Sequence, residues 1–473
     1  MSKPTRRDTL AGLAAMATAP LLPSCKSDGT EKTRPTEAPL TDFELLRERV
    51  DTVVILMMEN RTFDHFLGSL SLEEGRTEVD GLTAEMSNPD ASGEPIFPFR
   101  ATEDCLSDPP HSWSASHDQF NDGANDRFVT RYSSSTPENV MGYYTRDKLP
   151  ALYALSDAFV TCDAWFSSVM TSTWPNRVYS ICAENGGVQG NDFATDAFPS
   201  IFTPLAEAGH SWGGFYSNLP SVILAPDRLI TEVQMQTIDH FFSRAAAGTL
   251  PNVCFIEPIY GRNDDHPPVH PTAGQIFIQQ IYDALAKSPQ WDQCVFFITY
   301  DEHGGFFDHV PPPTTKDNYK KDGFDQMGFR VPSLIVGPWV KPGHVDHTVY
   351  GHTSMLAFIE HLFDIEPLTK RDAAQDPMRD AFDWEALAAN SPLPPVALDP
   401  IEADEDEIYA PECEGFSLFA TSSVTGQPEL EQYVRETLGG TEYDLVDQTD
   451  AIYEAMLVRA EKAGVLIRRG GDG

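Results

Sequence analysis

Residues 300–313 contain the densest group of side chains that could bind a cation or transfer a proton. Asp301 and Glu302 are adjacent, and His303 and His309 follow within the same segment. Two neighbouring carboxylates repel each other unless a cation or a shared proton lies between them. A polar loop that caps a core strand would account for the acids alone. The added histidines and a Gly-Gly turn favour a metal or phosphate site.

A second pair of polar residues, Glu59 and Asn60, follows the apolar run 53–58. Asn60 could cap a helix here, with Glu59 incidental. The apolar run 294–300 similarly precedes Asp301, and both runs are short and rich in β-branched or aromatic residues, as buried strands are. In open α/β sheets, ligands bind beyond the carboxyl ends of the strands. Two strand ends that both present an acid strengthen the prediction of a ligand site.

Thr173 lies next to a predicted helix start. Pro175 favours the first turn of a helix, so we expect the helix to begin near Trp174, with Thr173 just before it. Free backbone N–H groups and the helix dipole bind anions at such a position. The Thr173 hydroxyl would either cap the helix or attack a phosphorus atom held by these donors. Arg177, in the same helix, would pair with a phosphate oxygen or with a structural carboxylate.

Two more histidines lie beside prolines. His111 belongs to the segment 108–113, and His266 belongs to the polar segment 263–268. Each segment alone is typical of a surface loop. The two segments become candidates for a functional site only because of their order along the chain relative to the acidic and Thr173 segments.

The elements that would position these residues are those of an α/β protein. Strands are predicted over 53–58, 294–300 and 331–337, and helices are predicted over 149–159 and 355–363. A chain of 473 residues is long enough for one large domain with additions or for two domains. We expect a core domain over 43–390. An acidic, Pro-rich segment and a small amphipathic helical extension would follow over 391–473.

The N-terminal residues carry features of export rather than of a fold. Residues 1–25 contain Arg6-Arg7, a twin-arginine pattern, followed by an apolar run that is too short to span a membrane. The run ends at Cys25 in a sequence that resembles a lipoprotein cleavage box, although Pro23 is unusual there. Residues 26–42 are expected to be a tether. We therefore expect recognition by the twin-arginine export machinery and a periplasmic, envelope-anchored or secreted protein, with a lipid on Cys25.

The formal net charge of −39 limits the classes of partner. Binding of nucleic acid through its phosphates requires a basic surface, so we expect no nucleic-acid partner. Direct adsorption to anionic lipid is disfavoured for the same reason. Apart from Cys25, the cysteines are dispersed without Cys-x-x-Cys spacing, which argues against a zinc knuckle. Disulfides among them are permitted, whereas Cys294, in a core strand, is expected to be a buried thiol.

Several of these segments together resemble the bacterial and plant non-specific phospholipase C and acid phosphatase A family of phosphoesterases, within the alkaline-phosphatase-like superfamily. The resemblance runs from about residue 50 to 365, and the motifs occur in the family's order. They are Glu59-Asn60-Arg61-Thr62-Phe63-Asp64-His65, Asp108-Pro109-Pro110-His111, Thr173-Trp174-Pro175-Asn176-Arg177, Asp265-His266-Pro267, and Asp301-Glu302-His303-Gly304-Gly305 through Asp308-His309-Val310. The resemblance implies an α/β fold with a central, mostly parallel sheet flanked by helices. It also implies an active site at the strand ends.

The resemblance further implies roles for individual residues. The expected ligands of one divalent metal ion are Glu59, Asn60, Asp301 and Glu302. Thr173 aligns with the hydroxyl nucleophile that forms a phospho-enzyme. The residues expected to stabilise phosphoryl oxygens or protonate the leaving group are His111, His266 and His309, and those expected to bind substrate are Arg177 and His303. An all-oxygen shell suits Ca²⁺, Mg²⁺ or Mn²⁺ better than zinc.

The expected function is hydrolysis of phosphate esters, either phospholipids (phospholipase C type) or phosphomonoesters (acid phosphatase type). Thr171-Ser172-Thr173 departs from the Gly-Pro-Thr that family members often carry, although the spacing favours Thr173 as the nucleophile. The larger phospholipases of the family carry C-terminal β-domains that we do not expect here, which weakens the case for phosphatidylcholine. A non-catalytic, cation-binding envelope lipoprotein is an alternative of another class, suggested by Cys25 and the acidic charge. A sulfatase or nucleotide phosphodiesterase is a weaker one, because neither a formylglycine-type context nor a two-zinc histidine pattern is evident.

Overall fold

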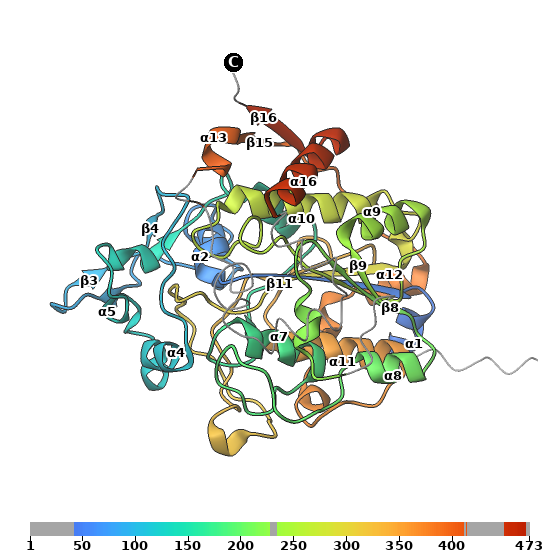
Figure 1. Cartoon of the computed structure of the whole chain (residues 1–473), viewed down its shortest axis with the longest axis horizontal. Coiled ribbons are helices and arrows are strands. Elements are labelled where there is room, and N and C mark those ends of the chain that lie inside the picture. Colours follow the sequence, from blue (N-terminus) through green and yellow to red (C-terminus); the bar gives the residue numbers. More distant parts are fainter. Residues whose placement is uncertain (1–41, 228–233, 411–412, 414–448, 470–473) are drawn as a thin grey trace, which may run out of the picture. The chain divides into compact units, whose positions relative to one another are not determined.

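A mostly parallel, eight-stranded sheet forms the centre of the part of the chain that the structure describes (Figure 1). This computed structural model describes residues 42–227, 234–410, 413 and 449–469. The strands of the sheet are β1 Thr52–Met58, β6 Val160–Cys162, β8 Trp212–Tyr216, β9 Met235–Thr237, β10 Val253–Ile256, β11 Cys294–Tyr300, β12 Leu334–Val336 and β13 Val345–Asp346. Their order is β13-β6-β12-β11-β1-β10-β8-β9. Only β12 runs antiparallel to its neighbours, so the predicted fold class is confirmed.

The register of β1 against β11 places the pair Glu59-Asn60 and the pair Asp301-Glu302 at the same edge of the sheet. The strands pair in parallel from Thr52 with Cys294 to Met58 with Tyr300, and every residue of both is buried. Continuous apolar runs are typical of parallel strands whose two faces are both covered. Because Met58 and Tyr300 are partners, the residues that follow them leave the sheet side by side.

Helices cover both faces of the sheet (Figure 1). The helices are α1 Asp42–Arg47, α2 Phe63–Leu67, α3 Ser69–Leu72, α4 Trp113–Phe120, α5 Phe128–Arg131, α6 Pro150–Ala158, α7 Thr173–Cys182, α8 Phe202–Glu207, α9 Ile238–Ala247, α10 Pro271–Ala286, α11 His352–Phe363, α12 Trp384–Ala389, α13 Glu405–Ile408 and α16 Thr449–Ala463. Figure 1 shows α9 and α10 on one face, and α7, α8 and α11 on the other. The helices predicted over 149–159 and 355–363 are confirmed as α6 and α11. Among the described residues, none of the helices has the length and apolar character to cross a membrane.

The described part of the C-terminal extension packs on the core. Strand β15 Ile401–Asp404 pairs in parallel with β16 Leu466–Arg469, and α16 packs against α10. Gln280 of α10 donates a hydrogen bond from Nε2 to the Met456 carbonyl at 2.9 Å. The described residues accordingly belong to one compact unit. The predictions of an export signal, a tether and a lipidated Cys25, and the helical spacing from about residue 427 up to 448, lie outside the described residues.

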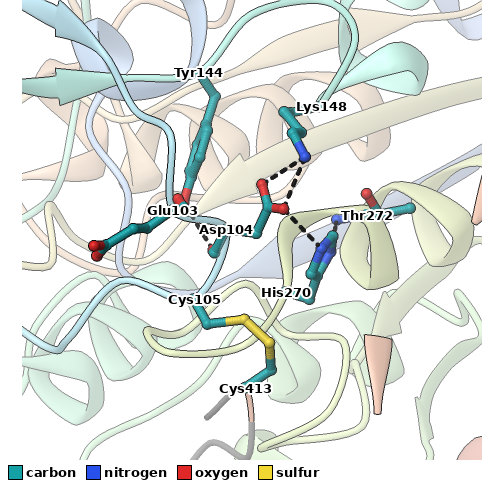
Figure 2. The surroundings of a disulfide bond; sticks show 8 residues. All are labelled: Glu103, Asp104, Cys105, Tyr144, Lys148, His270, Thr272 and Cys413. Carbon is teal, nitrogen blue, oxygen red and sulfur yellow. Dashed lines mark hydrogen bonds and ion pairs between the residues drawn. A yellow bond between two sulfur atoms is a disulfide. The ribbon is translucent and has the colours of Figure 1, made fainter. Parts of the chain in front are cut away.

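A disulfide joins the loop before His111 to the C-terminal extension (Figure 2). It links Cys105 to Cys413, which are 308 residues apart in the sequence. The neighbouring Asp104 carboxylate lies 2.7 Å from the Lys148 ammonium and 3.4 Å from His270 Nε2. The remaining described cysteines are free and buried, and among them the prediction of a buried Cys294 thiol is confirmed.

Candidate active site

Three acids follow three neighbouring strands of the central sheet. Glu59 comes directly after β1, Glu257 after β10 and Asp301 after β11, and all three are buried. Arg177 of α7 lies against each of them, at 3.4 Å from Glu59, 3.1 Å from Glu257 and 3.2 Å from Asp301. Our sequence reasoning missed Glu257. The available signal was the same as for the other two, an acid directly after the short apolar run 253–256.

Arg177 is held entirely by protein groups in this structure. Besides the carboxylates, its Nη2 donates to the carbonyl oxygens of Met57 and Met58 at 3.2 and 3.1 Å. Burial opposes the charge, but the surrounding groups, with Tyr260 and Asp301 foremost, raise the pKa of Arg177 above its ordinary value. Of the two partners that the sequence left open, the structure shows the carboxylates. Substrate binding by Arg177 stays a prediction.

The backbone around Asp301 fixes its side chain. Asp301 Oδ1 accepts hydrogen bonds from the backbone N–H groups of Asn60 at 3.0 Å and Glu302 at 2.7 Å. Burial raises the pKa of Asp301 to about 6, although Arg177 opposes the rise. Asn60 has a φ of 61° and does not cap α2, since that position belongs to Thr62. The helix-cap explanation of Asn60 is therefore wrong.

His352, at the start of α11, also contacts this strand end. Its Nε2 donates to the Asp301 carbonyl at 2.7 Å, while its Nδ1 accepts from the Trp165 indole at 3.3 Å. Burial lowers the pKa of His352 to about 4, so the ring is neutral at ordinary pH. No distinctive sequence signal marked this contact, because a histidine at the start of a helix is usually a surface residue.

Glu302 joins two histidines. Its Oε1 lies 3.0 Å from His111 Nδ1, and its Oε2 lies 3.2 Å from His303 Nδ1 and accepts from the Gly304 N–H at 2.8 Å. Burial alone would raise the pKa of Glu302, but His111 and then His303 lower it to about 2. Burial opposes the charge on His111 too, yet Glu302 and then Asp108 raise the pKa of His111 to about 10. The two side chains therefore form an ion pair over a wide range of pH.

Unsatisfied oxygen atoms at this edge fit a divalent cation. The buried side-chain oxygens that have no hydrogen-bond partner within the described residues include two at this edge, Asn60 Oδ1 and Thr173 Oγ1, whereas Glu302 Oε1 pairs with His111. A buried polar group without a partner is costly, which indicates a missing ligand. Arg177 also compensates only part of the charge on the neighbouring acids. Carboxylate and amide oxygens are ligands of hard cations, so the residues present fit the predicted ion.

Thr173 is the first residue of α7 rather than the residue before it. Ser172 takes the N-cap position, and its side chain makes no capping hydrogen bond. The N–H of Trp174 is bound by Asn191 Oδ1 at 2.8 Å, and the Thr173 hydroxyl does not cap the helix. Residues four apart lie on the same face of a helix, so Thr173 lies one turn above Arg177.

Asn176 fixes the loop that delivers Thr173. Its Nδ2 donates to the carbonyl oxygens of Val169, Thr171 and Ser172 at 3.2, 3.0 and 3.1 Å, while its Oδ1 accepts from the Val169 N–H. A single buried amide thus determines the path of the backbone before α7. Asn176 belongs to the motif of residues 173–177, but no role was predicted for it from the sequence.

His111 and His266 lie together at the mouth of the site. Ligand atoms of Asp108, His111 and His266 lie within 4.8 Å of one another, and the two imidazole ring centroids are 6.0 Å apart. A cleft of about 400 Å³, lined by residues 108–112 and 131–133, gives access to His111. Asp108, His111 and His266 are thus a further group of potential metal ligands beside the four predicted ones, and the cleft opens onto His111.

The other two predicted histidines lie elsewhere. His303 is buried, with Nε2 2.9 Å from Gln119 Oε1 on the side away from Glu302. His309 belongs to a separate group, in which its Nδ1 lies 2.7 Å from Asp64 and its Nε2 lies 3.1 Å from Asp80. The structure thus brings His303 but not His309 next to Glu302. Their roles in substrate binding and catalysis stay predictions.

A model of the Phosphoesterase family matches residues 50–366, more than half of the chain. The chain belongs to the Phosphoesterase family. This phosphoesterase is 36% identical over 374 residues to "Non-specific phospholipase C1" of Arabidopsis thaliana, which covers 68% of this chain and 69% of that protein. It is 29% identical over 457 residues to "Phospholipase C B" of Mycobacterium tuberculosis, which covers 81% of this chain and 86% of that protein.

Among solved structures, a protein in the alkaline phosphatase superfamily from Vibrio parahaemolyticus aligns with 72% of the phosphoesterase and 78% of its own chain. The sequence identity is 12% and the TM-score is 0.37, a likeness too small to carry an argument. The family model and the sequence relatives are sufficient to assign the family. The predicted family is confirmed, and the protein is a hydrolase that acts on phosphoric ester bonds.

Proposed function

We propose that this phosphoesterase is a metal-dependent, phospholipase C-type hydrolase that acts through a phospho-enzyme on Thr173. Its products would be diacylglycerol and a phosphorylated headgroup. The observation that carries the proposal is the Thr173 hydroxyl, fully buried and without a hydrogen-bond partner among the described residues, one turn above Arg177. The names of the relatives in Arabidopsis and Mycobacterium support the phospholipase C type.

In the proposed reaction, the Thr173 hydroxyl releases its proton to solvent, its oxygen attacks phosphorus, and the bond from phosphorus to the leaving alcohol breaks. His111, whose pKa of about 10 keeps it protonated at neutral pH, gives its proton to the departing oxygen. Water then attacks the phosphothreonine and gives one proton to the now neutral His111, while the departing Thr173 oxygen takes up a proton from solvent and is again a hydroxyl. The expected metal ligands are Glu59, Asn60, Asp301 and Glu302. A divalent ion held there supplies charge stabilisation to the phosphoryl group and lowers the pKa of the hydroxyl.

The test compares p-nitrophenylphosphorylcholine with p-nitrophenyl phosphate, with and without a chelator, on the chain from Lys26 onward. We expect the choline diester to be the better substrate and the chelator to abolish its hydrolysis. A preference for the monoester would replace the phospholipase with an acid phosphatase. Full activity in the chelator would overturn the metal dependence. A folded protein inactive on both esters would favour the cation-binding lipoprotein.

We also propose that the chain is exported by the twin-arginine route and anchored through a lipid on Cys25. The support is the Arg6-Arg7 pattern and the cleavage-box-like residues 22–25. Replacing both arginines by lysine should leave the protein in the cytoplasm of a bacterial host. Cys25→Ser should release it from the membrane fraction while leaving export intact. Unchanged fractionation of both variants would contradict the proposal.

A further inference from the structure

Gln119, on α4, connects the His111 loop to the end of β11. The side chain is fully buried. Its Nε2 donates to the Pro110 carbonyl at 2.9 Å, directly before His111, and lies 3.5 Å from the Gly305 carbonyl. Its Oε1 lies 2.9 Å from His303 Nε2. One amide therefore contacts both segments that flank Glu302.

The partners of Gln119 determine which way its amide faces. The Pro110 and Gly305 carbonyl oxygens can only accept hydrogen bonds, so the NH₂ group must face them. Oε1 then faces His303, and the His303 Nε2 must be the donor. The opposite edge of the same ring lies 3.2 Å from Glu302 Oε2. The amide thus orients His303, and His303 packs directly on the Glu302 carboxylate.

The backbone makes the same connection without any side chain. A Cβ added at Gly305 would lie 2.8 Å from both Pro109 Cβ and the Pro110 carbonyl oxygen. The turn after Glu302 is therefore in close contact with the loop that carries His111. The same two segments also carry Glu302 Oε1 and His111 Nδ1, which lie 3.0 Å apart. A shift of either segment would change that distance.

We propose that Gln119 is a positioning residue that holds His111 and Glu302 in their relative positions. It acts through the Pro110 carbonyl on one side and through His303 on the other. Loss of the amide should let the His111 loop and the Glu302 carboxylate move independently. Both metal affinity and the proton transfer assigned to His111 should then weaken. This inference rests on the proposed function.

The test uses two variants and a matched control in the full chain. Gln119→Met keeps the length of the side chain but removes its donors and its acceptor. Gln119→Glu keeps the acceptor for His303, and only its protonated form can still donate to Pro110. Gln280→Met is the control, because Gln280 is also a buried helical glutamine with one backbone acceptor, Met456, away from the site.

Binding of Mn²⁺ is measured by electron paramagnetic resonance, and kcat and KM by hydrolysis of p-nitrophenylphosphorylcholine. For Gln119→Met we expect the Kd for Mn²⁺ to rise and kcat to fall by about 10–100-fold, the usual effect of removing a support of metal ligands. KM should change by less than about 3-fold. For Gln119→Glu, the ratio of its kcat to that of the wild type should rise as pH falls from 8 to 5. Gln280→Met should lower only the melting temperature.

Equal Kd and kcat in Gln119→Met and Gln280→Met would overturn the proposal. If Gln119→Met is much less stable than the control, the pH dependence of the kcat ratio of Gln119→Glu to wild type becomes the deciding measurement. A kcat ratio that does not change with pH would overturn the proposal. The Mn²⁺ measurement needs no turnover. A wild type that hydrolyses neither ester, but loses Mn²⁺ affinity on Gln119→Met, would therefore overturn the proposed function and support the positioning role.

Discussion

At Thr173, a hydroxyl is buried without the hydrogen bond that burial normally demands. Its exposed fraction is 0%, and no described residue bonds Oγ1. Leaving a buried polar atom unpaired costs about 1–3 kcal/mol. A threonine that only capped the helix would not carry this cost, because capping supplies the missing bond. The isolated hydroxyl is best explained by a partner that arrives with the substrate.

The first prediction concerns the three adjacent hydroxyls at the start of α7, those of residues 171–173. Thr173→Ala should lower kcat by at least about 10³-fold, the scale of losing a nucleophile, with little loss of stability because no hydrogen bond is removed. Thr171→Ala is the control: it removes a bond of 2.5 Å to the Gln189 carbonyl and should cost about 1 kcal/mol with activity retained. Kinetics and thermal melting measure both effects. Full activity in Thr173→Ala, or loss of activity in Thr171→Ala, would show that Thr173 is not the nucleophile.

The second prediction separates metal binding from ordinary ion pairing. Asp301 and Asp317 are both buried carboxylates paired with a buried arginine, Arg177 and Arg371, at 3.2 and 2.9 Å. Breaking such a pair costs about 3–5 kcal/mol, so both Asp→Asn variants should melt at lower temperature. Only Asp301→Asn should abolish a stoichiometric metal ion, as measured by mass spectrometry after dialysis. Retention of the ion in Asp301→Asn would remove this residue from the metal site.

At the scale of elements, the turn after β11 has little room for any side chain at Gly304. Gly304 has a φ of +61°, and a Cβ there would lie 2.1 Å from the Asn60 carbonyl oxygen. Glycine alone adopts such a conformation without steric cost, and here it also allows the ends of β1 and β11 to approach. The turn therefore sets the distance between two of the predicted metal ligands, Asn60 and Glu302.

The third prediction tests this turn with a matched glycine. Gly75 has a φ of +71° and nothing within 4 Å of an added Cβ. Gly75→Ala should cost about 1 kcal/mol from backbone strain alone, with unchanged metal binding. In Gly304→Ala the new Cβ would clash with backbone atoms of Asn60, which cannot move without displacing the end of β1. This variant should therefore lose about 3 kcal/mol or more of unfolding free energy and bind metal more weakly. Equal losses in chemical denaturation, with metal affinity retained, would contradict the close-approach argument.

The elements that sequence could predict are those whose signal is local. The run 294–300 is β11 residue for residue, because a buried parallel strand is apolar throughout. The order of the strands is not local, and it alone reveals that Glu257 lies beside Glu59. The contacts of Gln119 were hidden for the same reason, since its partners are 9 and 184 residues away in the sequence. His309 shows the converse case: it is near Glu302 along the chain, but the contacts of its ring are with Asp64 and Asp80.

At the scale of the whole molecule, the net charge of −39 opposes folding at neutral pH. Self-repulsion of like charges destabilises a compact state, and salt weakens this repulsion. Individual buried groups act in the same direction. Burial raises the pKa of Asp308 to about 6, and burial together with the neighbouring Asp372 raises the pKa of Glu360 to about 10.

The last prediction is that the metal-free protein is more stable at pH 5.5 than at pH 8.5. Between its unfolded and folded pKa values, a carboxyl whose pKa is raised binds more protons when folded, so stability falls as pH rises through that window. His309, whose pKa is raised to about 10 against the opposing effect of burial, stabilises the fold below about pH 6.5, and this contribution is lost as pH approaches 10. Asp64, whose pKa is lowered, loses its contribution only in strong acid. Asp308, Glu360, His309 and Asp64 together favour a mildly acidic optimum, measured by the melting temperature in a chelator.

Glu360→Gln separates the local effect from the global one. The amide mimics the protonated acid, so the variant should melt close to the wild type at pH 5.5 and above it at pH 8.5. Added salt should raise the melting temperature of both proteins at pH 8.5, because it screens the net charge, but it should not remove the difference between them. If salt alone abolished that difference, Glu360 would contribute only to the overall charge. A difference that persists in salt would identify a buried acid whose neutral form the fold requires.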